Sequence, residues 1–222
     1  MSHDLKLVFV NEAFIIADKP AGWLAIPART GELDPRPCLQ VALTAEMKRP
    51  VLVVHRLDAE VSGLIVYALT REAHRAANQW FEHRNVHKTY EALTEGACPD
   101  ATEGATTVLE DVIMRGKKRA YTSSFGKKAV TRAVWEGERI SDGARWQSWT
   151  LRPETGRPHQ LRFQLSSRGY PIAGDSLYGA TAPFSGVGIA LRAVSLDFAG
   201  CPLASEFGLP ARILAHSWDV VK

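Results

Sequence analysis

Cysteine is scarce in this chain of 222 residues, and its three copies, Cys38, Cys98 and Cys201, lie far apart without a CxxC pair. This spacing fits neither a disulfide framework nor a thiolate metal site, so we expect free thiols in a reducing compartment. Long apolar runs are lacking too, both at membrane-spanning length and as a secretion signal near the N-terminus. The sequence therefore predicts a cytoplasmic protein without a membrane partner.

Several common catalytic motifs are also missing. The chain contains no HExxH pair, no GxSxG turn, no GxGxxG fingerprint and no GxxxxGKS or GxxxxGKT loop. Those motifs hold zinc, present a nucleophilic serine or cradle the phosphates of a nucleotide. His83 and His87 have helical spacing, but no cysteine or HExxH glutamate accompanies them. We therefore expect no metal and no cofactor.

Acidic residues are absent between Asp111 and Glu136, although the net charge of the whole chain is only +3. That stretch contains the cations Arg115, Lys117, Lys118, Arg119, Lys127, Lys128 and Arg132. Such a cluster on hairpin loops could attract the phosphates of a nucleic acid. A set of solvated, charged turns explains it equally well.

The composition is that of an ordinary globular protein, with 45% hydrophobic and 23% charged residues. No repeat, low-complexity segment or long Gly/Ser/Pro linker divides the chain. We therefore expect a single domain over residues 1–222.

The pattern of apolar residues favours strands over most of the chain. Helices are predicted at 38–48, at 71–84 after an N-cap at Thr70, and at 158–169, with Pro158 in the first turn and Gly169 at the C-terminal cap. Strands are predicted at 5–10, 14–20, 51–54, 63–70, 88–96, 106–114, 119–125, 129–137, 145–152, 188–198 and 211–218. This arrangement predicts an α+β fold with an antiparallel or mixed sheet.

The segment HRLDAE, residues 55–60, places Asp58 between two strand-like runs. A carboxylate held at the mouth of a hairpin can act as a general base or as a nucleophile. Asp58 could instead bond its own backbone as an ordinary turn residue. A hydrolytic pair with Glu60 is disfavoured, because residues two apart on a strand point the same way and leave no room for a substrate.

The predicted helix 158–169 places His159, Arg162 and Ser166 on one face and two leucines, Leu161 and Leu165, on another. A guanidinium fixed on a packed helix suits a buried carboxylate or a phosphate, although an exposed helical arginine is the simpler alternative.

Two further residues have two interpretations each. Asp175, in the turn GYPIAGDSLYG, could be structural or part of a site. Tyr90, in the strand KTYEALTEG, could belong to the core or could stack on a base.

Four segments together resemble one family. HRLDAEVSGL resembles the HRLDxxTSGL signature of the RluA-type RNA pseudouridine synthases, and KTYEALTEG is similar to their K-x-Y-x-A strand. ETGRPHQLRFQLSSRGYPIAGDSLYG is similar to their TGRxHQIR and GxPIxGDxxYG block, and FIIADKPAGWLAIP is similar to their opening segment. The similarity spans roughly residues 5 to 180 in one order. One departure is Val61, which stands where the signature has threonine.

The resemblance implies an isomerase that converts uridine in RNA into pseudouridine without a cofactor or metal. It implies a mixed, largely antiparallel central sheet in two halves, with a catalytic cleft between them and a few flanking helices. The implied catalytic residues are Asp58, Tyr90 and Arg162; as the partner of Asp58, Arg162 is preferred to Arg157 because it shares a helical face with His159. The implied RNA-binding residues are His55, Arg56, Lys88, Arg157 and His159.

The implied reaction detaches uracil from C1′ of its ribose and rejoins it through C5. Asp58 would attack the sugar or remove one of its protons, and both routes stay open. The target base must leave its stack, so base flipping is expected. The expected partner is a stem-loop of ribosomal or transfer RNA, bound by a monomer that lacks a separate S4-like RNA-binding domain. The alternative is a non-catalytic RNA-binding or RNA-folding protein on the same scaffold.

Overall fold

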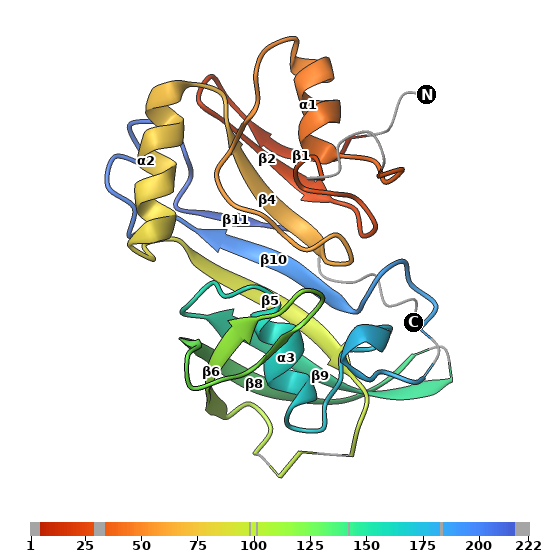
Figure 1. The fold of residues 1–222 in the computed structure, drawn as a ribbon. Coiled ribbons are helices and arrows are strands. Elements are labelled where there is room, and N and C mark those ends of the chain that lie inside the picture. The colour runs from red at the N-terminus through yellow and green to blue at the C-terminus, as the bar shows by residue number, and fades with distance from the viewer. Residues whose placement is uncertain are drawn as a thin grey trace. The chain divides into compact units, whose positions relative to one another are not determined.

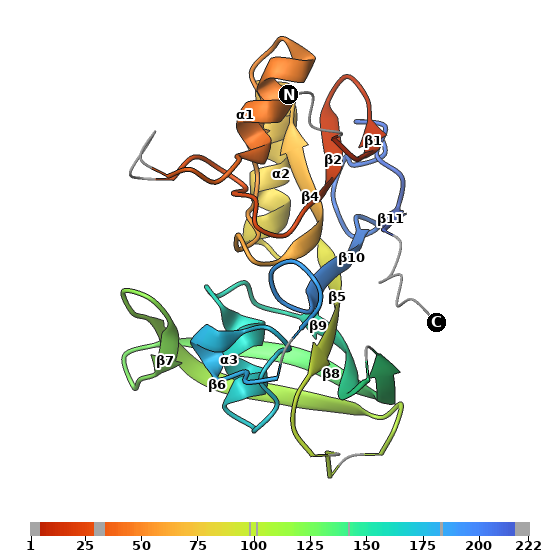
Figure 2. The ribbon, with the colours of Figure 1, turned by 90° about the vertical axis from the view of Figure 1, so that its right-hand side faces the viewer.

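The structure is a computed structural model that describes residues 5–28, 34–97, 99–100, 102–141, 143–182 and 184–215. Cys98 and the end of the last expected strand, residues 216–218, lie outside the described residues. The chain forms two compact units (Figures 1 and 2). The first comprises Met1–His87 and Ala193–Ala215, and the second Lys88–Arg192 and His216–Lys222.

The first unit contains strands in the order β1, β2, β4 and β10, with β3 paired to β4 and β11 paired to β10. The pairs β1–β2, β2–β4, β3–β4 and β10–β11 are antiparallel. Their bounds are Leu7–Val10 for β1, Phe14–Lys19 for β2, Leu52–Val53 for β3, Ser62–Ala68 for β4, Leu191–Asp197 for β10 and Arg212–Leu214 for β11. Both β2 and β4 are buried along their whole length, including the polar residues Asp18, Lys19 and Ser62. The expected hairpin around Asp58 is formed by β3 and β4.

Helices α1, Leu39–Met47, and α2, Arg71–Glu82, lie beside these strands (Figures 1 and 2). The predicted N-cap is confirmed, because the Thr70 hydroxyl accepts a 3.1 Å hydrogen bond from the Ala73 amide. The apolar stripe of α2 packs against the strands in one core. Its buried members include Ala73, Ala77 and Trp80 from α2 and Phe14, Ile16, Leu64, Val66, Leu196 and Phe198 from the strands and the residue after β10.

The second unit is a sheet in the order β5, β9, β8, β6 and β7 in which all neighbouring strands are antiparallel. The bounds are His87–Thr94 for β5, Thr106–Arg115 for β6, Ala120–Thr122 for β7, Lys127–Ser141 for β8 and Ala144–Pro153 for β9. A short helix α3, Gln160–Ser166, and a 3-10 turn η2, Ser176–Tyr178, complete it. The predicted α+β class with a largely antiparallel sheet is confirmed.

Helix α3 begins later than the sequence predicts. His159 precedes it in the left-handed conformation, with φ 53°, so Pro158 lies outside the helix rather than in its first turn. The predicted stop at Gly169 is confirmed. The Tyr170 amide bonds the Leu165 carbonyl and the Gly169 amide bonds the Ser166 carbonyl, around a φ of +84° at Gly169 that favours glycine.

Among the described residues no helix is long and apolar enough to cross a membrane. Over the same ranges, no group of three or more His, Cys, Asp or Glu side chains is placed to hold a metal ion. Cys38 and Cys201 are free thiols, as expected.

Candidate active site

Asp58 lies in the loop between β3 and β4, directly before a turn formed by Ala59 and Glu60. The turn closes through a 3.2 Å hydrogen bond from the Val61 amide to the Asp58 carbonyl. The side chain of Asp58 is partly exposed, while its neighbour Leu57 is buried. The loop is thus tied into the core on one side of the carboxylate and closed by a turn on the other.

Lys19, at the end of β2, holds this turn from within the first unit. Its side chain is completely buried, and its ammonium donates to the carbonyls of Pro20 at 2.9 Å and Trp23 at 2.8 Å. A third hydrogen bond, 3.1 Å long, goes to the carbonyl of Ala59, the residue that follows Asp58. The Gly22 amide donates to the same carbonyl at 2.8 Å. Two donors from the β2 segment therefore fix the peptide beside the carboxylate.

Burial lowers the pKa of the Lys19 ammonium to about 8, and the carboxylates of Glu60 and Asp58 oppose that shift. Desolvation is the larger effect, because the ammonium has given up water for carbonyl partners. Lys19 is therefore charged at neutral pH but titrates well below an ordinary lysine.

Two residues near Asp58, His55 and Val61, are also held within the first unit. His55 accepts a 3.1 Å hydrogen bond from the Val66 amide through Nε2 and stacks on Phe81 at 4.5 Å between ring centroids. Arg56 is exposed. Val61, which replaces the threonine of the signature, is buried with 3% exposure, so its methyl groups pack in the core.

Gly63 lets β4 approach β10 closely. Its φ is +107°, and a Cβ there would lie 2.2 Å from the carbonyl oxygen of Ala193. No side chain fits, so the glycine of the HRLD signature segment is a packing requirement.

In the second unit, Arg162 on α3 forms a buried bidentate ion pair with Asp175. Its Nε donates at 2.7 Å and its Nη2 at 2.8 Å, and the two residues are 3% and 1% exposed. This geometry is the strong form of an arginine–carboxylate pair. Of the two interpretations of Asp175, the structural one is therefore supported, since it fixes the guanidinium. Nη1 is the part of Arg162 that this pair does not use.

Arg162 and Ser166 share a face of α3 as predicted, whereas His159 precedes the helix, and all three residues meet at Tyr178. His159 Nδ1 lies 3.1 Å from the Tyr178 hydroxyl, and the Arg162 guanidinium lies over the Tyr178 ring at 5.2 Å. The Ser166 hydroxyl donates to the Tyr178 carbonyl at 2.5 Å. Leu161 and Leu165 are buried on the other side, as the spacing predicts.

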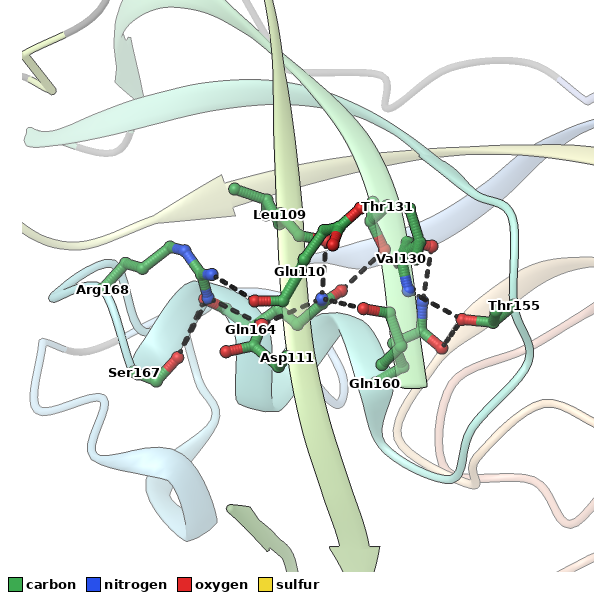
Figure 3. A network of polar contacts seen from close by, with 11 residues as sticks. Leu109, Glu110, Asp111, Val130, Thr131, Thr155, Gln160, Gln164, Ser167 and Arg168 are labelled. Carbon is green, nitrogen blue, oxygen red and sulfur yellow. Dashed lines mark hydrogen bonds and ion pairs between the residues drawn. The ribbon is translucent and has the colours of Figure 1, made fainter. Parts of the chain in front are cut away.

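Two buried amides hold α3 against the sheet (Figure 3). Gln164, with no exposed surface, donates to the Leu109 carbonyl and the Asp111 carboxylate at 3.0 Å each, and accepts from the Thr131 hydroxyl at 2.6 Å. Gln160 accepts from the Thr155 hydroxyl at 2.7 Å and donates to the Val130 carbonyl at 3.0 Å. The helix that carries Arg162 is thus attached to β6, β8 and the segment after β9 by satisfied polar groups.

Tyr90 and Lys88 lie on β5, where Tyr90 pairs with Leu151 of β9. Tyr90 is 9% exposed, so most of its ring is in the core. Burial lowers the pKa of Lys88. Its ammonium lies near Gly156, 3.8 Å from the position that a Cβ would occupy on that glycine.

Arg157 lies next to that glycine. Its Nε donates to the Lys128 carbonyl at 3.0 Å and its amide to the Gln160 side chain at 3.0 Å. The loop before α3 is therefore held by backbone and amide contacts.

The basic segment is compensated in part, which the sequence did not suggest. Lys128 pairs with Glu110 at 3.0 Å, and Arg132 pairs with Glu154 at 2.6 Å. These acids come from β6 and from the residue after β9, outside the stretch that lacks acidic residues. Exposed cations gather at the β6–β7 turn: Arg115, Lys117, Lys118 and Arg119.

The expected site residues are divided between the units. Asp58, His55 and Arg56 belong to the first unit, and the structure adds Lys19 to their surroundings. The second unit contains Lys88, Tyr90, Arg157, His159 and Arg162, and the structure adds Asp175 and Tyr178. Within that unit, His159 and Arg162 are brought together at Tyr178. The pairing of Asp58 with Arg162 stays a prediction.

Comparison with known proteins identifies the family. The model of the RNA pseudouridylate synthase family matches residues 13–167. An uncharacterised RNA pseudouridine synthase of Zymomonas mobilis is 34% identical over 92% of this chain and 94% of its own length. A tRNA pseudouridine synthase C of Pectobacterium carotovorum is 32% identical over 79% of this chain, which spans only 48% of that protein.

A solved structure supports the fold. The human protein RNA pseudouridylate synthase domain containing 1 superposes with a TM-score of 0.76 at 24% identity, over 99% of this chain and 85% of its own. Because the family model covers more than half of the sequence and a relative matches it almost end to end, the chain belongs to the RNA pseudouridylate synthase family and is an RNA pseudouridine synthase.

Proposed function

We propose that the chain isomerises a specific uridine in a stem-loop of ribosomal or transfer RNA, with Asp58, Tyr90 and Arg162 at the reacting nucleotide. The bond between C1′ and N1 breaks, the uracil turns, and a bond forms between C1′ and C5. The C5 proton is lost and N1 gains one, so the composition of the nucleotide is unchanged. No oxidant, reductant or group donor is consumed, and we propose no cofactor.

The observation that carries this proposal is the fixed turn beside Asp58. Lys19 and Gly22 both donate to the Ala59 carbonyl, and the turn itself closes from Val61 to Asp58. Because folding has already ordered this loop, the entropy cost of orienting the carboxylate toward the ribose does not add to the barrier of the reaction. Asp58 then acts on the sugar, as a nucleophile at C1′ or by removing a sugar proton.

Arg162 and Tyr90 have complementary roles. Arg162, already held by Asp175 through Nε and Nη2, would offer Nη1 to the Asp58 carboxylate and keep it ionised. Tyr90, mostly buried on β5, would stack on the flipped uracil and assist loss of the C5 proton. A base in the duplex is out of reach of Asp58, so the target nucleotide must be flipped.

RNA is bound in this proposal by residues around the loop of Asp58 and before α3. They are His55, Arg56, Lys88, Arg157 and His159. Of these, Arg56 is exposed, and Arg157 lies in a loop whose backbone is already held. Such a loop suits phosphate contacts, because phosphate is recognised by fixed cations and amides.

The proposed class of RNA is supported by the family and by one relative. A relative that is 32% identical is named a tRNA pseudouridine synthase, which makes transfer RNA one substrate to examine. We propose that the protein acts as a monomer in the cytoplasm. Mapping pseudouridines in total RNA from cells with and without the gene identifies the uridine, as a site that is lost in the deletion strain.

The proposal is tested by Asp58→Asn, which keeps the size of the side chain and removes its charge. Pseudouridine formation should fall below detection while RNA binding and thermal unfolding stay close to wild type. Glu60→Gln is the matched control, because it removes the neighbouring carboxylate and should retain activity. Near-normal turnover by Asp58→Asn would overturn the assignment. A wild-type protein that binds RNA but modifies none would favour the non-catalytic alternative.

A further inference from the structure

The β6–β7 hairpin of the second unit is exposed and basic. Arg115 ends β6 and pairs with Ala120, which begins β7. Between them, the Gly116 amide donates to the Arg119 carbonyl at 2.9 Å and closes the turn. The side chains of Arg115, Lys117, Lys118 and Arg119 all face solvent. We call residues 115–120 the basic hairpin.

Tyr178 holds the base of this hairpin. Its hydroxyl accepts a 2.6 Å hydrogen bond from the amide of Ala120, a residue 58 positions earlier in the chain. Both residues are buried, at 7% and 2% exposure. Arg115 is close enough for its charge to act on the Tyr178 hydroxyl. The hairpin that carries the exposed cations is therefore held at its base by a buried hydrogen bond.

Tyr178 also contacts Arg162 and Ser166 on α3 and His159 directly before it. Its hydroxyl is 3.1 Å from Nδ1 of His159, its ring lies under the guanidinium of Arg162, and its backbone carbonyl accepts from the Ser166 hydroxyl. Arg162 is in turn clamped by Asp175, which lies directly before η2, the turn that carries Tyr178. One tyrosine thus joins the basic hairpin to the guanidinium proposed for the active site.

The hydroxyl can make both bonds at once. An amide such as that of Ala120 can only donate, so the Tyr178 oxygen accepts, and its own proton can go to Nδ1 of His159. Burial raises the pKa of Tyr178, which keeps that proton on the oxygen at neutral pH. Phenylalanine at this position would keep the ring under Arg162 and lose both bonds, of which the one from the Ala120 amide holds the hairpin.

We propose that Tyr178 is a positioning residue that fixes the basic hairpin relative to Arg162. The distance between the RNA phosphates held by the hairpin and the nucleotide at the active site is then fixed. Part of the RNA affinity therefore depends on a hydroxyl that does not contact RNA. This inference rests on the proposed function, because it takes Arg162 as part of the active site.

The test compares Tyr178→Phe with Tyr121→Phe, on RNA from cells lacking the gene. Tyr121 is a matched control, because it lies on β7 directly after the basic hairpin, is 44% exposed, and donates its hydroxyl to the sulfur of Met114 in the paired strand. Tyr178→Phe should raise KM for RNA roughly three- to tenfold, the change expected for one hydrogen bond, and leave kcat at saturating RNA unchanged. Tyr121→Phe should change neither.

The same substitution in a second variant distinguishes an effect on the basic hairpin from a general loss of structure. In a variant with Lys117→Gln and Lys118→Gln, the hairpin has lost its lysines, so adding Tyr178→Phe should change KM less than it does in the wild type. The inference is overturned by an unchanged KM, by a loss in kcat alone, or by the same fold-change in both backgrounds.

Filter binding to the same RNA keeps the inference testable if the proposed function fails. A wild type that makes no pseudouridine refutes the function, and the inference then stands or falls on affinity. It stands if Tyr178→Phe weakens binding and Tyr121→Phe does not, and it falls if both bind as the wild type does.

Discussion

The ammonium of Lys19 donates a 3.1 Å hydrogen bond to the carbonyl oxygen of Ala59, the residue that follows Asp58. Lys19 has no exposed surface and is paired across β2 and β4 with Gly63, where β4 leaves the loop. The strand that precedes Lys19 and the strand that follows Asp58 are therefore neighbours. A buried lysine in the core of the first unit thus fixes the position of the peptide group beside the proposed catalytic carboxylate.

Replacing Lys19 by methionine should loosen that turn. The change removes a buried donor from the carbonyls of Pro20 and Trp23 and one of two donors from that of Ala59. We expect the free energy of unfolding to fall by about 1–3 kcal/mol, the cost of leaving buried acceptors unsatisfied. We also expect kcat to fall more than KM rises, since the turn positions Asp58. Chemical denaturation and steady-state kinetics measure the two effects.

Arg145→Met is the control for this variant. Arg145 pairs with Glu138 at 2.8 Å, and the two side chains are 73% and 39% exposed. A pair exposed on both sides contributes under about 1 kcal/mol, so both stability and kcat should stay near wild type. Equal effects of the two substitutions would contradict a special role for Lys19.

The pKa of Lys19 makes a separate prediction about pH. The pKa of Lys19 is about 8 in the folded protein, against an ordinary value of 10.5. Between pH 8 and pH 10.5 the unfolded chain therefore binds more protons than the folded chain. Stability from this group therefore rises with pH across that window. The difference in unfolding free energy between wild type and Lys19→Met should grow from pH 7.5 to pH 10. Urea denaturation at several pH values measures it, and a difference that shrinks would contradict the burial effect.

Local patterns in the sequence predicted elements and faces well. The spacing of Ala73, Ala77 and Trp80 gave α2 and its buried side, and Thr70 gave its start. The spacing of Arg162 and Ser166 gave the face of α3 that meets Tyr178, and His159 reaches the same tyrosine from the position before the helix. Periodicity works here because one face of each helix must be apolar.

Contacts between distant segments were not predictable in this way. Lys19 and Ala59 are 40 residues apart, and Tyr178 and Ala120 are 58 apart, and neither pair produces a local pattern. The Lys19 contact goes to a backbone carbonyl, which every residue has, so the residue types do not reveal it. The start of α3 was misplaced because His159 takes a left-handed conformation, which is uncommon for residues other than glycine and ends the helical pattern before Gln160.

The buried pair of Arg162 and Asp175 should be far more sensitive than a surface pair. Asp175→Asn leaves a guanidinium that is 3% exposed without its carboxylate, so we expect a loss of about 3–5 kcal/mol in unfolding free energy. Asp197→Asn removes the same group from a pair with Arg212, whose side chain is 62% exposed, and should cost under about 1 kcal/mol. Thermal and urea unfolding of both variants measure the contrast, and similar losses would show that burial is not decisive.

The basic hairpin should account for part of the salt dependence of RNA binding. Lys117 and Lys118 are exposed at its tip, and each phosphate contact that they make releases a counterion. Changing both to glutamine should weaken RNA binding and lower the slope of log affinity against log salt by about 1–2. Arg71→Gln with Arg75→Gln, on the exposed side of α2, changes the net charge equally and should leave the slope unchanged. If the two double variants give equal slopes, the hairpin lysines are merely solvated. If the slope falls in the hairpin variant alone, RNA phosphates lie beside Arg115 and Ala120, where Tyr178 holds the hairpin.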